Sequence, residues 1–186
     1  YYLHKTIKGK MSVKIEGDKL ESKLIILRGN SGSGKTTTAK ILQEQLGRGT
    51  LLVSQDNVRR EMLRVHDREG NLSIDLIRQI AEFGKGHCEF IIVEGILYKK
   101  FYGKMLHDLI QFYEGKAYCY YFDLSFEETM RRHNTRLKKD EFGEESLRKW
   151  WIPNDYLEVD HEVKLTDTLA QKDILELILA QLQESN

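Results

Sequence analysis

Hydrophobic residues in this sequence gather in five short runs, and the stretches between the runs repeat with the period of a helix. The runs cover residues 24–27, 51–53, 90–93, 118–122 and, more weakly, 163–165. The helical stretches cover residues 35–46, 73–85, 101–113, 125 to about 137, and the chain from about residue 168. Apolar runs without alternating polar residues are typical of strands covered on both faces. Strands that alternate with helices in this way predict an α/β fold, with a parallel sheet between two helical layers.

Three local patterns predict where helices begin or end. Gly47 directly follows the helical stretch 35–46, and glycine is common just beyond a helix. Ser125 stands three residues before Glu128, which is the spacing of a capping box. Thr168 precedes the last helical stretch and is a second candidate cap. The predicted buried face of that last helix carries Leu175, Ile178 and Leu182.

Composition and charge narrow the class of protein. The 186 residues are 40% hydrophobic and 31% charged, which suits one globular domain with a full core. Lys plus Arg equals Asp plus Glu at 29 each, and this neutrality makes nucleic-acid binding an unfavoured main activity. No apolar run approaches the ~20 residues that a membrane helix needs, so we expect no membrane span. Cys88 and Cys119 lie in apolar surroundings and are expected to be reduced core residues.

The strongest chemical signal is a glycine-rich segment between the first strand and the first helix. Residues 29–36 match the pattern G-x-x-x-x-G-K-[ST] in full. The glycines let the backbone curl so that its N–H groups point at a phosphate, and the helix N-terminus adds a partial positive charge. Lys35 is expected to reach the β- and γ-phosphates, and Thr36 to offer its hydroxyl to Mg²⁺. The predicted ATP-binding residues are Gly29, Asn30, Ser31, Gly32, Ser33, Gly34, Lys35, Thr36 and Thr37.

Ligands of open α/β sheets bind beyond the carboxyl ends of the strands, so the residue after the second strand is a candidate for chemistry. Asp56 stands there and could orient an acceptor hydroxyl and take its proton. Arg59 and Arg60 follow it and could hold an anionic or hydroxyl-rich acceptor. A structural alternative is that Asp56 caps a helix beginning near Asn57.

Glu94 ends the third apolar run and resembles the acidic end of a Walker B strand. A carboxylate at that point can hold Mg²⁺ through water, and it also lies where an acceptor could bind. The alternative is a strand-end acid paired with a surface lysine. A carboxylate beside the glycine-rich strand would otherwise be a costly buried charge, which favours the functional interpretation.

A strongly basic stretch follows the fourth apolar run. Residues from about 131 to 152 are predicted to form a helical lid over bound ATP, with Arg132 and Arg136 on one helix face as catalytic contacts. The alternative is an ordinary solvated helix face. The adjacent Trp150 and Trp151 cannot both point inward, so one is expected in the core and the other beside a substrate pocket or a dimer contact.

Together these motifs resemble the uridine kinase family over roughly residues 23–137. The residues that carry the likeness are Ser54-Gln55-Asp56, Glu94-Gly95-Ile96-Leu97, Phe122-Asp123 and Arg131-Arg132, in the same order. The resemblance implies a three-layer P-loop NTPase fold with strand order 2-3-1-4-5, ATP with Mg²⁺, Asp56 as general base, and closure of an arginine-rich lid. The connection from Asp56 to Glu94 is shorter than in uridine kinases, and Asp56-x-x-Arg59 is also similar to zeta-toxin-like and chloramphenicol-phosphotransferase-like kinases.

These expectations define the functions to be compared. The leading hypothesis is an ATP-dependent kinase acting on a small hydroxylated, nucleoside-like acceptor. The others are a phosphotransferase for a nucleotide sugar or antibiotic, an NTPase switch without an acceptor, and polynucleotide end processing. Residues 23–186 are expected to form one domain after an N-terminal extension of residues 1–22, in which Met11 is a candidate start. The polar, basic first residues predict no signal peptide, so the cytoplasm is the expected compartment, with a monomer or a homodimer both open.

Overall fold

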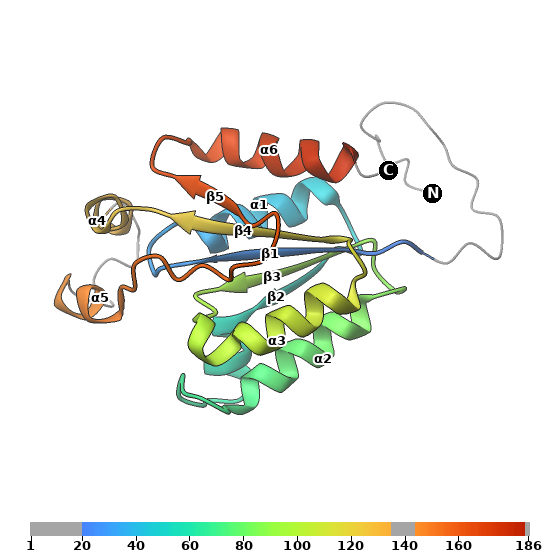
Figure 1. Ribbon diagram of the computed structural model, residues 1–186, viewed down its shortest axis with the longest axis horizontal. Helices are drawn as coiled ribbons and strands as arrows, with labels where there is room; N and C mark the ends of the chain where they lie inside the picture. Colours follow the sequence, from blue (N-terminus) through green and yellow to red (C-terminus); the bar gives the residue numbers. More distant parts are fainter. Residues whose placement is uncertain (1–19, 135–143, 185–186) are drawn as a thin grey trace.

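The computed structural model describes residues 20–134 and 144–184, which form one five-stranded sheet with helices packed around it (Figure 1). The strands are β1 (Lys23–Gly29), β2 (Leu51–Ser54), β3 (Phe90–Gly95), β4 (Ala117–Asp123) and β5 (Val163–Thr166). Every neighbouring pair is parallel, and the order is β2-β3-β1-β4-β5. The predicted α/β fold and the strand order implied by the resemblance are therefore confirmed.

Helices cover both faces of the sheet because the central strands β1, β3 and β4 bury residues on both sides. The helices are α1 (Lys35–Leu46), η1 (Asn57–Met62), α2 (Leu72–Gly84), α3 (Lys99–Phe112), α4 (Phe126–Asn134), α5 (Glu144–Trp150) and α6 (Gln171–Glu184). Figure 1 shows α1 and α6 on one side of the sheet and α2 and α3 on the other. Alternate residues of β1 fill the two cores, with Ile26 on the α2/α3 face and Ile25 on the α1/α6 face. The carboxyl ends of all five strands consequently meet along one edge.

Two predicted helix caps differ, wholly or in part, from the structure. Thr168 does not cap α6, since its hydroxyl pairs with Thr166 at 2.8 Å and the helix begins at Gln171. The Asp173 carboxylate accepts from Ala170 N at 3.0 Å and so satisfies that helix end instead. The predicted capping box is half correct: Ser125 Oγ accepts from Glu128 N at 3.2 Å. The Glu128 carboxylate does not return the bond, because it binds arginines as described below.

A buried arginine on the α2/α3 face of the sheet binds the segment between α5 and β5. Arg28, on β1 directly before the glycine-rich segment, is fully buried and lies within 2.9 Å of Asp155 and 3.2 Å of Glu162. Its Nη2 also donates to the Leu97 carbonyl at 3.1 Å. One guanidinium therefore joins the strand before the glycine-rich segment, the loop after β3 and the chain after α5.

Candidate active site

The glycine-rich segment forms a phosphate cradle at the start of α1. Gly29 has φ 140°, and a Cβ there would lie 2.9 Å from the Phe122 carbonyl oxygen, so a larger residue would force β1 and β4 apart. Gly34 has φ 104° at the turn into the helix. Lys35 is buried and its Nζ lies 2.7 Å from the Asn30 carbonyl and 3.1 Å from Ser33 Oγ. The ammonium group of Lys35 thus lies inside the glycine-rich loop, which is the position that contact with bound phosphates would require.

Glu94 lies beside this cradle on the neighbouring strand. Pairing of β1 with β3 places it opposite Leu27, and only 2% of its surface is exposed. Its Oε2 accepts from Thr36 Oγ1 at 3.0 Å. The two oxygen groups predicted to serve a magnesium ion are therefore in contact, and the partner of Glu94 is a hydroxyl rather than a surface lysine.

Gln55, which was noted above only as part of the family likeness and was assigned no role, fixes the loop after Glu94. Its buried side chain accepts from Leu97 N at 2.9 Å and donates to Asp67 at 3.2 Å. Leu97 has φ 45°, a conformation that side chains rarely adopt, and Arg28 holds its carbonyl. The turn that follows Glu94 is thus held from both sides.

Gly95 is the position where this arrangement tolerates no side chain, and its substitution gives a stability prediction. A Cβ on Gly95 would lie 2.5 Å from Gln55 Cβ, so Gly95→Ala must displace Gln55. We expect a loss of about 1–3 kcal/mol in the free energy of unfolding, measured by urea denaturation. Gly103→Ala is the matched control: it lies within α3 and its added Cβ meets only the flexible Lys99 side chain at 3.3 Å. The control should be neutral or slightly stabilising, and equal losses in both variants would contradict the role given to Gln55.

Asp56, Arg59 and Arg60 form a separate group at the end of β2. Asp56 lies 3.0 Å from Arg59 Nη2 and 3.1 Å from Arg60 Nε. Its backbone is helical and its side chain makes no capping bond, so the alternative interpretation of Asp56 as a helix cap is wrong. The residues that follow form a π-helical turn, a conformation frequent at functional sites. Asp56 is 64% exposed and Arg59 13%, so a carboxylate open to ligands is backed by a largely covered cation.

Arg132 reaches back from α4 to the cradle, as the lid prediction requires. Its Nη1 donates to the Ser33 carbonyl at 3.1 Å, and its Nε donates to Glu128 at 2.6 Å. Glu128 also accepts two bonds from Arg131, and these partners lower the pKa of Glu128 to about 2. A carboxylate that stays ionised at neutral pH therefore positions both arginines. Arg136 and the other residues of the predicted lid from 135 to 143 lie outside the described residues.

A groove of about 390 Å³ runs from the cradle between α4 and the start of α6. Its lining includes the glycine-rich loop and the side chains of Arg131 and Arg132 on one side, and Gln171 and Ile174 on the other. A groove with phosphate-binding backbone at one end and arginines along one wall fits a nucleotide. The structure thus gathers Lys35, Thr36, Glu94 and Arg132 around the cradle.

Neither tryptophan lies in the core, so the expectation that one of them would do so is wrong. Trp150 is 43% exposed. Trp151 packs edge-on against Phe126, with ring centroids 5.9 Å apart, and lines a second cavity. Cys119 is buried and Cys88 half-buried, and both are free thiols.

The described residues contain no group of three or more His, Cys, Asp or Glu side chains suited to holding a metal ion. No helix within ranges 20–134 and 144–184 has the length and apolarity needed to cross a membrane.

The sheet order, the phosphate cradle and the groove together define a P-loop nucleotide-binding protein with a kinase-like α/β fold. The chain belongs to the AAA_33 family of AAA domains, whose model matches residues 24–150. No curated protein sequence matches it significantly.

Solved structures with a similar fold include several kinases. A putative kinase from Chloroflexus aurantiacus has a TM-score of 0.64 at 18% identity, with 91% of this chain and 100% of that one covered. A gluconokinase from Sinorhizobium meliloti has a TM-score of 0.61 at 16% identity, with coverage of 90% and 94%. The APS kinase of Mycobacterium tuberculosis, solved with AMPPNP and APS, has a TM-score of 0.61 at 15% identity, with coverage of 88% and 98%. At these identities the likeness establishes the fold.

Proposed function

We propose that the protein is an ATP-dependent kinase that transfers the γ-phosphate to a hydroxyl group of a small molecule. The observation that carries the proposal is the contact between Thr36 of the P-loop and the buried Glu94 at the end of the adjacent strand. That pair provides oxygen ligands of the kind that Mg²⁺ prefers, directly or through water. Fold relatives that are kinases for small molecules support the same class of reaction.

The residues divide the work of an in-line transfer. Lys35 and the backbone N–H groups of the cradle would stabilise negative charge on the β- and γ-phosphates. Asp56 would orient the acceptor hydroxyl and take its proton, and Arg59 or Arg60 would contact the acceptor. Arg132, held by Glu128 against the cradle, would neutralise charge on the phosphates and help to exclude water. Thr36 and Glu94 would hold Mg²⁺, directly or through water, and the ion would help to neutralise charge on the phosphates.

The acceptor that we place first is a nucleoside-like compound, following the resemblance to uridine kinases. A nucleotide sugar or an antibiotic is the alternative within the same chemistry. An NTPase switch is the alternative from another class, and it needs no acceptor base.

The decisive substitution is Asp56→Asn. It keeps the shape of the side chain but removes the proton acceptor, so we expect transfer to fall by about 10²-fold while ATP affinity stays within about twofold. Transfer would be measured with radiolabelled ATP and a panel of nucleosides, sugars and antibiotics. Asp75→Asn is the matched control, since Asp75 is also exposed but lies on α2 beside Arg78, and it should leave transfer unchanged.

Two outcomes would count against the proposal. If no hydroxyl acceptor in the panel is phosphorylated, the kinase assignment fails. If ATP hydrolysis is the sole activity and is equal in the wild type and the Asp56→Asn variant, the NTPase switch is favoured.

A further inference from the structure

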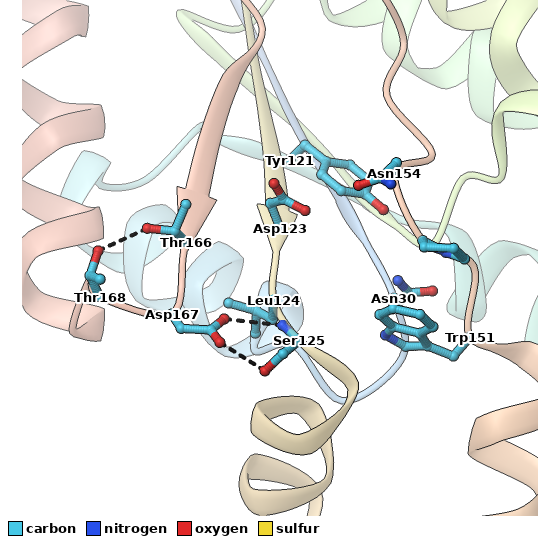
Figure 2. A pocket seen from close by; sticks show the side chains of 11 residues that line it. Asn30, Tyr121, Asp123, Leu124, Ser125, Trp151, Asn154, Thr166, Asp167 and Thr168 are labelled. Atoms are coloured by element: carbon cyan, nitrogen blue, oxygen red, sulfur yellow. Dashed lines mark hydrogen bonds between the residues drawn. The ribbon is translucent and has the colours of Figure 1, made fainter.

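The structure contains a second cavity on the opposite face of the sheet from the nucleotide groove. Phe122 lines the groove and points to the α1/α6 face, whereas its strand neighbours Tyr121 and Asp123 line the second cavity. The cavity measures about 510 Å³ and lies between the ends of β4 and β5 and the chain that follows α5 (Figure 2). Its volume is within the range of small-molecule sites.

One wall of the cavity is an indole ring with an unused hydrogen-bond donor. Figure 2 shows Trp151 on the side formed by the chain after α5, facing the ends of β4 and β5. Its Nε1 is buried and has no hydrogen-bond partner among the described residues. Buried indole N–H groups usually find an acceptor. This wall therefore presents an apolar ring surface, and the indole N–H is left without an acceptor.

The opposite wall carries two carboxylates. Asp123 accepts from the Tyr156 hydroxyl at 2.9 Å, and Asp167 accepts from Ser125 N at 3.1 Å and Ser125 Oγ at 2.8 Å. These partners are neutral, and no Lys or Arg lines the cavity in the described part of the chain. The lining itself consequently carries negative charge, with Lys164 as a nearby cation that lies over the Tyr156 ring, and two carboxylates in the wall disfavour bound phosphates and carboxylates.

The remaining polar groups are amides and hydroxyls that can both donate and accept. They belong to Asn30 and Asn154 on one side and to Thr166 and Thr168 on the other. A ligand hydroxyl can accept from an N–H group and donate to a carboxylate, so one kind of group suits every wall. An ammonium group would add attraction to the carboxylates and to the aromatic face.

We propose that this cavity binds a hydroxyl-rich small molecule, uncharged or carrying an amine, with Trp151 as the platform for its apolar face. The site shares Asn30 with the edge of the glycine-rich loop but no lining residue with the nucleotide groove, and it goes beyond the proposed phosphate transfer. It is coupled to the P-loop, because the Asn30 amide donates to Ile152 O at 2.7 Å and accepts from Ile152 N at 2.8 Å. A ligand that moves Trp151 would therefore also displace its neighbour Ile152 and, through these bonds, Asn30 of the glycine-rich loop.

The test uses three probes that share one sugar ring but differ in charge: glucose is neutral, glucosamine is cationic and glucose 6-phosphate is anionic. Binding is followed by tryptophan fluorescence in a Trp150→Phe variant, in which Trp151 is the sole remaining tryptophan. We expect saturable binding in the order glucosamine, glucose, glucose 6-phosphate. Asp123→Asn should reduce the preference for glucosamine over glucose by about threefold to tenfold. Trp151→Phe, followed by calorimetry, should weaken the binding of both sugars by a similar factor.

Several results would overturn the proposal. These are no binding of any probe at 20 mM, tightest binding of glucose 6-phosphate, or equal binding by the wild type and both cavity variants. Thr168→Val provides a second cavity variant should Trp151→Phe fail to fold. Sugar binding without sugar phosphorylation separates this site from the acceptor site. Phosphorylation of a sugar that falls in parallel with its binding in Trp151→Phe would make the cavity part of the acceptor site and reject a distinct site.

Discussion

Replacing Lys35 by Met is expected to lower the rate of phosphate transfer by about 10³-fold or more. The lysine is buried in the phosphate cradle, where its ammonium lies 2.7 Å from the Asn30 carbonyl. Its charge acts where negative charge develops on the transferring phosphate, and such preorganised groups are usually worth 10²–10³ in rate each, with lysine adding a full charge. Methionine keeps most of the length and the apolar stem. The loss should therefore appear mainly in kcat.

The measurement is steady-state transfer to the best acceptor from the panel, with ATP affinity determined separately by calorimetry. Lys40→Met is the matched control, because Lys40 lies on the same helix and is exposed. It should change kcat by less than about twofold. A Lys35→Met enzyme that retains a tenth of its activity would show that the cradle does not perform the chemistry assigned to it.

The sequence was sufficient to predict those parts of the site that depend on local pattern. The P-loop has a contiguous motif between a strand and a helix, and Glu94 ends an apolar run, so both could be placed from spacing alone. Their contact then follows from β1 and β3 being neighbours, which the resemblance implied and the structure confirms. Four of the strands were predicted for the same reason, since continuous apolar runs identify buried strands, whereas β5 was the weaker prediction because Lys164 interrupts its run.

Other parts of the site depend on partners that no local pattern announces. Gln55 looks like an ordinary polar residue until Leu97, 42 positions later, needs its oxygen. Glu128 was taken as half of a capping box, but two arginines compete for its carboxylate more strongly than a backbone N–H group does. Helix α6 begins at Gln171, where the Asp173 carboxylate accepts from the backbone N–H of Ala170. The predicted cap Thr168 is therefore not needed at this helix end.

Arg28 is the extreme case, and its removal is expected to have the largest effect on stability. Arg28→Met should lower the free energy of unfolding by about 3–5 kcal/mol, because the Asp155 and Glu162 carboxylates would lose their shared cation. Urea denaturation would measure the loss. Arg78→Met is the matched control: its ion pair with Glu82 is on the surface of α2, and its loss should cost less than about 1 kcal/mol.

The cause of that loss can be separated from the loss of packing by changing pH and by removing the stranded charges. Burial already raises the pKa of Asp155, and without Arg28 this shift should increase. A carboxyl whose pKa is higher in the folded state than in the unfolded state destabilises the fold most above that pKa, and the penalty fades as pH falls through it. The difference between Arg28→Met and wild type should therefore be smaller at pH 5 than at pH 8. Adding Asp155→Asn and Glu162→Gln should restore part of the stability at pH 8, whereas a deficit that is independent of pH and unrelieved by these changes would assign the effect to lost packing.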